Sequence, residues 1–416
     1  MYQLVRGTYD LLPADAEKLR LFLGKAVEIL EKSGFSELET PILEDAGLFN
    51  RSVGEGSDIV RKEMYTFTDR KGRLLALRPE GTAPIVRACL EHNLLQTNPS
   101  ARFYYFGPMF RYDRPQSGRY RQFLQLGVEA FASAAAYTDA EIVFLLCRIL
   151  TAASIGSYTV EVNSLGCRKC QENYGRELVH FLQDRPGSFC PDCQQRLQNN
   201  PLRIFDCKVP DCRNILKEVP TVRQGFCPEC VRHFDEFLNY SRIFGVPLRV
   251  NERLVRGLDY YTRTVWEVLA GDGTNAVAAG GRYNDLVADL DGPAVPALGF
   301  AVGLERLLSL MPAAFLEKKG LRLIFLDRPS LEKALELLPV LREALPVTVT
   351  VSPEEKGLKN QLHLAGREGY RFALIIGPEE LAKKEALVRN LDAGTQEPVS
   401  FETLVENLKL RFNPEI

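Results

Sequence analysis

Eight of the ten cysteines of this 416-residue chain lie between residues 167 and 230. They occur as CRKC, CPDC, DCKVPDC and CPEC, so three pairs have two intervening residues and one pair has four. The surrounding residues 163–240 carry many arginines and few strand signals, which leaves little material for an apolar core. We therefore predict an insertion that interrupts a sheet and is held together by its cysteines.

Eight thiolates suit two tetrahedral Cys₄ zinc sites, or about two zinc ions per chain. The candidate ligands are Cys167, Cys170, Cys190, Cys193, Cys207, Cys212, Cys227 and Cys230. Spacing leaves the pairing open between a sequential and an interleaved arrangement. Reduced thiols without metal are the alternative, and an iron–sulfur cluster is a further one. Cys89 and Cys147 lie outside the set and are expected in the core.

The composition is that of an ordinary globular protein with two or three domains. Apolar residues make up 45% and charged residues 25%, and the net charge is -2, so any nucleic-acid contact must come from local patches. The opening MYQLVRGTYDLLP has no signal-peptide pattern, and no apolar run reaches the ~18 residues of a membrane span. We expect a cytoplasmic protein without membrane contact, where disulfides are rare.

The pattern of secondary structure changes near residue 321. Upstream strand signals fall within residues 73–78, 102–106, 121–132 and 260–268. They are joined by long connections and followed by helices, which predicts an α+β domain on a largely antiparallel sheet. Downstream, short apolar strands alternate with helical segments, which predicts a small α/β domain with a largely parallel sheet. We place the two domains at 1–320 and 321–416.

Charged and phenolic side chains gather at the ends of several predicted strands. The stretch 107–131 carries arginines on both sides of a Pro-Gln-Ser-Gly turn, and RGLDYYTRT precedes a strand with Arg256 and two tyrosines. Guanidinium groups suit phosphate and carboxylate oxygens. A carboxylate beside them, such as Glu129, is either half of an ion pair or a receptor for a cationic or N–H-bearing ligand. The alternative for the stretch 107–131 is a surface ion-pair network.

Taken together, these motifs resemble the histidyl-tRNA synthetases, a family of class II aminoacyl-tRNA synthetases. FRYDRPQSGRYRQFLQLGVE resembles class II motif 2, GFAVGLERL resembles motif 3, and Pro41 falls where motif 1 carries its proline. RGLDYYTRTVWE and AAGGRYNDL are similar to two histidine-specific signatures, and RGTYDLLP and LRPEGTA also match. The resemblance runs in order from about residue 5 to 410. It implies a class II antiparallel-sheet catalytic domain over 1–320, with the cysteine-rich insertion at 163–240, and an anticodon-binding domain over 321–416.

The resemblance also implies an ATP-dependent ligase. Such an enzyme converts L-histidine and ATP, with Mg²⁺, to histidyl-adenylate and pyrophosphate, and then transfers histidine to tRNA(His). It implies ATP contacts for Arg111, Arg119 and Arg306. Arg111 and Arg256 would act in catalysis, with Arg256 between the α-phosphate and the histidine carboxylate.

Histidine binding is the second implication for individual residues. The implied contacts are Glu80, Thr82, Gln125, Glu129, Arg256, Tyr260, Tyr261 and Tyr283. The resemblance further implies that Arg114 and Gln116 face the acceptor end of the tRNA. We expect a homodimer, because class II motif 1 builds the subunit interface in this family.

Two other functions fit parts of the pattern. One is a non-catalytic regulatory paralogue that partners ATP phosphoribosyltransferase, but such paralogues have degraded histidine signatures and lack the C-terminal domain. The other is a tRNA-binding or histidine-sensing module without chemistry. The cysteine set departs from many members of the family, so the zinc prediction comes from the residues themselves and not from the resemblance.

Overall fold

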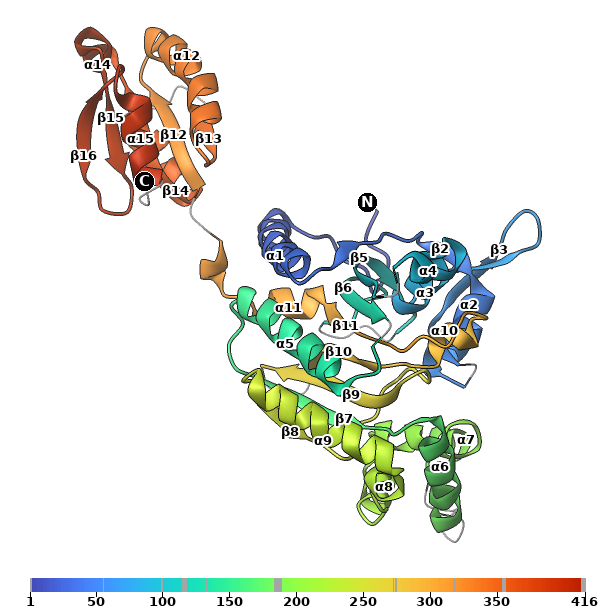
Figure 1. The fold of residues 1–416 in the computed structure, drawn as a ribbon. Helices are drawn as coiled ribbons and strands as arrows, with labels where there is room; N and C mark the ends of the chain where they lie inside the picture. The colour runs from blue at the N-terminus through green and yellow to red at the C-terminus, as the bar shows by residue number, and fades with distance from the viewer. Residues whose placement is uncertain are drawn as a thin grey trace. The chain divides into compact units, whose positions relative to one another are not determined.

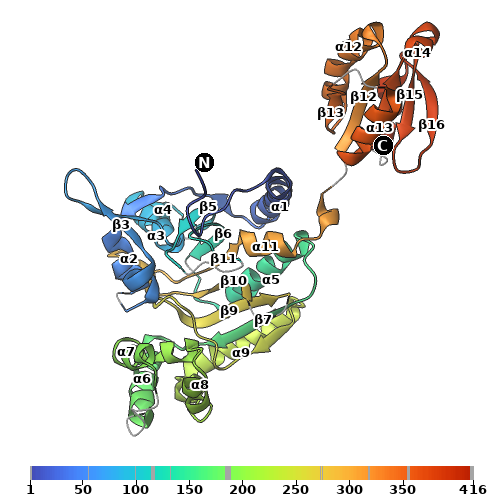
Figure 2. The same cartoon turned by 180° about the vertical axis from the view of Figure 1, so that it is seen from behind.

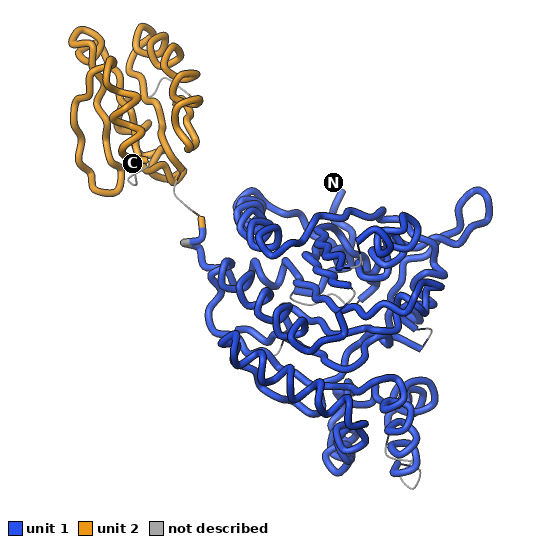
Figure 3. Tube along the Cα trace, viewed as in Figure 1, with its two compact units in different colours: residues 1–315 blue, residues 316–416 orange. Residues whose placement is uncertain are grey.

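The structure is a computed structural model that describes residues 2–54, 56–98, 100–113, 118–131, 133–182, 189–271, 273, 275–316, 319–353 and 357–412. The chain divides into two compact units, Met1–Phe315 and Leu316–Ile416 (Figure 3). In the described part of the chain, no helix has the length and apolarity that crossing a membrane requires.

An eight-stranded sheet organises the first unit (Figure 1). Its strand order is β1-β5-β6-β11-β10-β9-β7-β8, and every neighbouring pair is antiparallel except β1–β5 and β7–β8. The strands are β1 (Ser36–Glu37), β5 (Arg102–Phe110), β6 (Gln122–Phe131), β7 (Tyr158–Ser164), β8 (Leu248–Val250), β9 (Thr262–Ala270), β10 (Asn275–Arg282) and β11 (Ala297–Gly303). The predicted α+β class with a largely antiparallel sheet is thus confirmed.

Helices cover one face of this sheet and enclose the largest apolar core. They are α1 (Pro13–Lys32), α5 (Ala136–Ala152), α9 (Pro228–Ile243) and α11 (Leu304–Leu310). Side chains alternate along a strand, so Leu126 and Val128 of β6 enter this core while Glu129 turns to the opposite face, where it meets Thr82. One face of the sheet therefore packs in the apolar core, and the opposite face carries polar side chains such as Glu129.

The opposite face holds a second core and a small accessory sheet. Its helices are α2 (Ala46–Val53), α3 (Thr82–Glu91), α4 (Leu94–Thr97) and α10 (Leu286–Asp289). Strands β2 (Leu43–Asp45), β4 (Leu74–Leu77) and β3 (Tyr65–Thr68) form an antiparallel sheet, and the π-helical turn η1 spans Ile59–Glu63. β9 begins at Thr262, later than the predicted start at 260, because Tyr260 and Tyr261 belong to the turn that precedes it.

The cysteine-rich insertion leaves the sheet after β7 and returns to it at β8. It contains α6 (Arg168–Leu182), α7 (Pro191–Asn199), the 3₁₀ helix η3 (Pro201–Asp206), α8 (Pro210–Leu216), a further 3₁₀ turn (Val222–Gly225) and the start of α9. Helices α6, α7 and α8 project beyond the β7–β8 edge of the sheet in both views (Figures 1 and 2). The prediction that an insertion interrupts the sheet is confirmed.

The second unit is a five-stranded sheet with helices. The strand order is β13-β12-β14-β15-β16, from β12 (Lys319–Phe325), β13 (Val349–Val351), β14 (Tyr370–Ile376), β15 (Glu385–Asn390) and β16 (Gln396–Ser400). The helices are α12 (Arg328–Ala344), α13 (Leu358–Arg367), α14 (Pro378–Lys383) and α15 (Leu404–Phe412). β12 pairs in parallel with β13 and β14, but β15 and β16 add antiparallel pairs, so the sheet is more mixed than the alternation predicted.

Candidate active site and cysteine clusters

A cavity of about 380 Å³ lies in the first unit, and four of the predicted arginines line it. Arg111 follows β5, Arg119 precedes β6, Arg256 precedes β9, and Arg306 lies in the first turn of α11. The antiparallel order brings these four strand and helix ends to one place, although they are far apart in sequence. The arginines of three distant motifs therefore share one cavity.

Backbone carbonyls hold two of these guanidinium groups in place. Arg111 donates from Nε to the Pro79 carbonyl at 2.8 Å. Arg306 donates from Nε to the Gly118 carbonyl at 2.9 Å and from Nη1 to the Ala276 carbonyl at 2.6 Å. Burial, together with the nearby positive charge of Arg119, lowers the pKa of Arg306. Like charges packed this closely form a binding site for a polyanion.

Arg256 is buried beside a carboxylate. Its Nη1 lies 3.0 Å from Oε1 of Glu267, on β9. Burial opposes the charged guanidinium most strongly, but Glu267, Tyr261 and Asp206 together outweigh it and raise the pKa of Arg256. Among the described residues, the Nε of Arg256 is a buried donor without a hydrogen-bond partner. A buried, unpaired N–H is costly unless it serves a ligand.

Glu80, Thr82 and Glu129 form a buried polar cluster at the N-terminus of α3. Glu80 accepts hydrogen bonds from the backbone N–H groups of Thr82 at 2.7 Å and Ala83 at 2.9 Å. Thr82 donates from its hydroxyl to Glu129 at 2.7 Å, and the Tyr283 hydroxyl also donates to Glu129. Burial raises the pKa of Glu129 to about 8, against the two hydroxyl donors that favour its ionised form. The cluster can read a ligand that carries N–H groups.

Three tyrosines and two glycines shape the wall of the cavity. Tyr260, Tyr261 and Tyr283 pack with ring centroids 4.8 to 6.3 Å apart, and burial raises the pKa of Tyr261 to about 12. A Cβ at Gly281 would lie 2.8 Å from the Tyr261 ring, and one at Gly299 would lie 2.2 Å from Oε2 of Glu129. The glycines are needed because the strands approach these side chains so closely.

Most of the predicted site residues line this one cavity. They are Glu80, Thr82, Arg111, Arg119, Gln125, Arg256, Tyr260, Tyr261, Tyr283 and Arg306. Glu129 does not line it directly but lies behind Thr82 and Tyr283. Arg114 and Gln116 fall outside the described residues. The structure thus places these side chains together, while their individual roles stay predictions.

Other cavity residues were not predicted from the sequence. Glu267 interrupts the buried run Val265 to Val268, and a lone carboxylate in such a strand was a usable signal. Glu305 accepts from the Tyr9 hydroxyl at 2.5 Å and from the Leu124 backbone N–H at 2.6 Å, which fixes the start of α11. Arg203 comes from the insertion, and nothing in its local sequence, PLRIFD, indicated a place at the site.

The eight cysteines of the insertion form two separate groups of four. One group is Cys167, Cys170, Cys227 and Cys230, and the other is Cys190, Cys193, Cys207 and Cys212. The first pair along the chain joins the fourth, and the second joins the third. The arrangement is nested, so both the sequential and the interleaved pairing are wrong. Neither could be excluded from spacing, because the helices between the pairs decide which pairs meet.

Local sequence explains how each pair presents its sulfurs. In CPDC and CPEC the proline occupies the first helical position, where its missing N–H costs nothing. The cysteine before it occupies the N-cap position of α7 or α9, and the second cysteine lies in the first turn. Two thiols three residues apart at a helix start point the same way.

The geometry of both groups fits a tetrahedral metal. The four sulfurs of each group lie within 4.8 Å of one another, with measured pairs at 3.6, 4.0 and 3.8 Å. Zn–S bonds of about 2.3 Å in a tetrahedron place sulfurs about 3.8 Å apart. Backbone N–H groups also point at the sulfurs, as from Cys167 to Cys230 and from Cys190 to Cys212. Such N–H donors stabilise thiolates.

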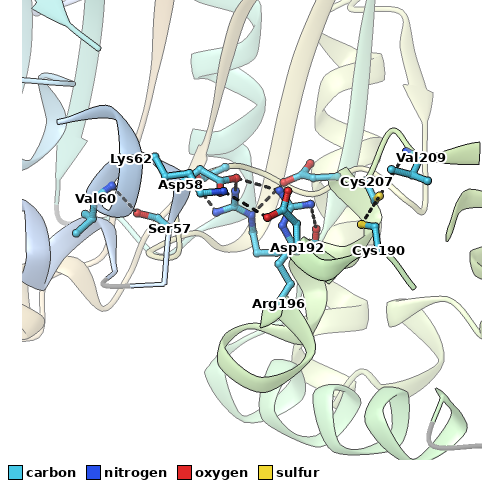
Figure 4. A network of polar contacts seen from close by, with 12 residues as sticks. Ser57, Asp58, Val60, Lys62, Cys190, Asp192, Arg196, Cys207 and Val209 are labelled. Atoms are coloured by element: carbon cyan, nitrogen blue, oxygen red, sulfur yellow. Dashed lines mark hydrogen bonds and ion pairs between the residues drawn. The ribbon is translucent and has the colours of Figure 1, made fainter. Parts of the chain in front are cut away.

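Polar contacts join the insertion to the rest of the first unit (Figure 4). Asp58 pairs with Arg196 of α7 at 2.9 Å and with Arg203 of η3 at 3.6 Å. Lys62 of η1 pairs with Asp192 at 3.3 Å. Asp192, Arg196 and Arg203 lie close in sequence to cysteines of the Cys190 group. Asp58 and Arg203 also line the cavity, so the Cys190 group supports one side of it.

Comparison with known proteins matches nearly the whole chain to the family that its sequence motifs resemble. Residues 7–173 and 209–307 match the family model for histidyl-tRNA synthetase, and residues 321–411 match that for an anticodon binding domain. The histidine–tRNA ligase of Aquifex aeolicus is 44% identical over 97% of this chain and 99% of its own, and that of Thermodesulfovibrio yellowstonii is 42% identical over 100% of both. The crystal structure of apo histidyl-tRNA synthetase from S. aureus has a TM-score of 0.80 and 32% identity, covering 98% of this chain and all of the other.

Proposed function

The chain belongs to the histidyl-tRNA synthetase family, and we propose from this premise that it is a histidine–tRNA ligase with its active site in the arginine-lined cavity. The observation that carries the assignment to this cavity is the convergence of Arg111, Arg256 and Arg306 from three separate motifs. The enzyme activates L-histidine with ATP and then transfers the histidyl group to tRNA(His).

The first step needs alignment and charge neutralisation more than covalent help. A histidine carboxylate oxygen attacks the α-phosphorus of ATP, the bond to the bridging oxygen breaks, and pyrophosphate leaves. Arg111 and Arg256 neutralise charge at the α-phosphate, and Arg256 also aligns the carboxylate. Arg119 and Arg306 hold the outgoing phosphates. Mg²⁺ favours phosphate oxygens with one or two carboxylates, and Glu267, which lines the cavity, would supply such a carboxylate.

Histidine is recognised by the buried polar cluster. Glu129 and Tyr261 contact the imidazole ring, while Glu80, Thr82 and Gln125 receive the α-amino group. The Oε1 atom of Gln125 is a buried acceptor without a partner among the described residues, which supports a role in binding an N–H group. Tyr260 and Tyr283 line the pocket. A site that must satisfy such hydrogen bonds rejects analogues without them by about 10⁴–10⁵.

The two cysteine groups hold structural zinc, about two ions per chain. The support is the four-sulfur geometry of each group and the N–H donors around it. All ligand positions are taken by thiolates, so these sites are closed and supply no Lewis acid to the reaction. The zinc instead stabilises the fold of the insertion.

tRNA(His) and a second copy of the chain are the proposed partners. In the second unit Lys359, His363 and Arg389 line a depression that suits an RNA loop, and Arg114 and Gln116 face the acceptor end. Leu43, Phe67 and Leu74 are exposed on the small sheet near Pro41, which supports a homodimer contact there. The cytoplasm is the compartment where these substrates meet.

The regulatory paralogue of ATP phosphoribosyltransferase fits less well. Such a protein has no need of the complete arginine set, yet all four arginines line the cavity. It also lacks an anticodon-binding domain, whereas residues 321–411 match one.

Histidine-dependent ATP–pyrophosphate exchange tests the proposal. The wild-type protein should catalyse exchange, and Arg256→Ala should lower the rate on the order of 10²–10³-fold, as for loss of one preorganised electrostatic donor. Arg148→Ala, an exposed arginine on α5, is the control and should leave the rate unchanged. Absence of histidine-dependent exchange in the pure, metal-loaded protein would contradict the assignment.

A further inference from the structure

The segment Arg256–Arg263 carries Arg256, Tyr260 and Tyr261 into the cavity, but most of it is irregular backbone outside the sheet. Only its last residues belong to β9. The chain must therefore fix this segment from outside the sheet. Asp259 donates from its backbone N–H to the Val53 carbonyl at 3.3 Å and Arg256 pairs with Glu267, and further contacts come from the insertion, at both ends of the segment.

Arg203 of η3 holds the first end. Its Nη1 donates to the Gly257 carbonyl at 2.9 Å and lies 3.4 Å from Oδ1 of Asp259. Asn200 donates to the same carboxylate oxygen at 2.9 Å. Arg203 is buried, with 8% of its surface exposed, so these contacts are shielded from water and salt.

Gln171 and Gly166 hold the other end. Gln171 donates from Nε2 to the Tyr261 carbonyl at 2.9 Å. The Arg263 N–H donates to the Gly166 carbonyl at 2.7 Å, and the Leu165 N–H donates to the Arg263 carbonyl at 2.7 Å. Arg263 has a φ of 51°, a left-handed conformation that a non-glycine residue keeps only when its surroundings impose it.

Each anchor is tied to one cysteine group. Gln171 directly follows Cys170, and Gly166 directly precedes Cys167, so this end belongs to the Cys167 group. Arg203 lies between Cys193 and Cys207, and the Cys207 N–H donates to the Ile204 carbonyl at 3.0 Å, so the first end belongs to the Cys190 group. One cysteine group thus supports each end of the segment Arg256–Arg263.

We infer that the metal-bound insertion is a structural part of the active site, in which Arg203 and Gln171 are positioning residues that clamp the two ends of Arg256–Arg263. The inference rests on the proposed function, because it assigns the clamp to histidine activation. Misplacing a catalytic group by about 1 Å costs on the order of 10²-fold in rate. Metal occupancy therefore controls catalysis through the order of this segment, although the metal touches no substrate.

Matched methionine variants test the clamp, because methionine removes the donors and keeps much of the volume. Arg203→Met and Gln171→Met should each retain about two zinc ions per chain and lower kcat of ATP–pyrophosphate exchange on the order of 10–100-fold. KM for ATP should change less than kcat. Amide hydrogen exchange should become faster in peptides covering 256–263 and stay unchanged in α1. Arg176→Met, at an exposed arginine of α6 that donates to Asn173 of the same helix, is the control.

Unchanged amide exchange at 256–263 in both variants would overturn the clamp. If Arg203→Met loses metal, Arg203→Lys is the variant to test, because lysine keeps the positive charge but lacks the guanidinium donors. If residues 256–263 of Arg203→Lys exchange their amide hydrogens as slowly as in the wild type, the inference is again overturned. Wild-type protein stripped of metal should lose protection at 256–263, and retained protection would overturn the role of the metal. Amide exchange and metal content can be measured without enzymatic activity. Absence of histidine-dependent ATP–pyrophosphate exchange in the wild-type protein would therefore contradict the proposed function without deciding the clamp.

Discussion

The insertion and the second unit are both small, yet they are held together in different ways. The buried cluster of the insertion includes Cys193, Cys207 and Cys212 among its core members. The main core of the second unit is built from aliphatic and aromatic side chains such as Leu323, Leu374 and Ile376, and that unit contains no cysteine. The insertion also buries apolar side chains such as Leu178 and Ile204, but cysteines occupy positions within that core, whereas the main core of the second unit consists of aliphatic and aromatic side chains.

This difference teaches where each region is vulnerable. Apolar packing spreads its stabilisation over many contacts, so one substitution removes a small part. A metal site concentrates its stabilisation in four ligands, so one substitution removes most of it. The following predictions test this contrast, from the largest effect to the smallest.

Loss of one cysteine ligand should have the largest effect. Structural zinc contributes about 10–16 kcal/mol of apparent binding free energy, and Cys212→Ser removes one of the four thiolates of its group. Metal content should fall from about two ions to about one per chain, and amide hydrogen exchange should become fast in α7, η3 and α8. Exchange in the second unit should not change.

Cys147→Ser provides the control, because this thiol is half-buried on α5 and belongs to neither group. It should keep both metal ions. A Cys212→Ser protein with full metal content and a protected insertion would remove the contrast between the two regions.

Truncation of one core residue in the second unit should have a smaller effect. Leu374 of β14 is fully buried, and Leu374→Ala should destabilise the unit by about 2–5 kcal/mol through lost burial and a cavity. Leu335→Ala, at a position of α12 that is 50% exposed, should stay within about 0.5 kcal/mol. Denaturant unfolding followed by amide exchange of β14 measures both. An equal effect of the two truncations would contradict the assigned core.

Glu129 is expected to have an effect of intermediate size. It is a carboxylate buried in the first unit, outside the insertion. Burial raises its pKa to about 8, while an unfolded glutamate has a pKa of about 4.3. The folded protein thus binds more protons between these values, so stability falls as pH rises through this window. Glu129→Gln should remove this loss, which is on the order of 1–3 kcal/mol. Thermal unfolding at pH 6 and pH 9 measures it, and parallel curves for both proteins would contradict the raised pKa.

The ion pairs that dock the insertion should contribute least. Asp58 pairs with Lys62, Arg196 and Arg203, and its side chain is 32% exposed. Partly exposed pairs contribute about 0.2–1 kcal/mol each, so Asp58→Asn should produce only a modest increase in amide exchange of α7 that shrinks in high salt. Asp235→Asn removes the exposed pair with Arg223 and should not affect α7. A loss of metal in Asp58→Asn would show that docking and metal binding are not separable.

Much of the fold was predictable because local patterns and global architecture agree. The strand signals at 102–106 and 121–132 correspond to β5 and β6, which pair in antiparallel, and alternation along β6 puts Val128 in the core and Glu129 on the opposite face. β15 and β16 were missed because their faces mix polar residues with Ala386, Val388 and Val399, so that no apolar run marks them.

The site was predictable only in part. Arg111, Arg256 and Arg306 were found because each lies in a compact motif at an element end. Arg203 was not found, since its place depends on how far η3 reaches from the Cys190 group toward Gly257, and this is a property of tertiary packing. The nested pairing of the cysteines was not predictable for the same reason.

The nested pairing has a consequence for how this region varies. Cys167 follows the end of β7, and Cys230 lies in the first turn of α9, yet their sulfurs belong to one group. The chain therefore leaves the sheet and returns toward it at one place, the neck, where Cys167, Cys170, Cys227 and Cys230 meet. A change of helix length inside the neck should therefore leave the path of β7 and β8 unaltered, provided that Gln171 and Arg203 stay within reach of the segment Arg256–Arg263.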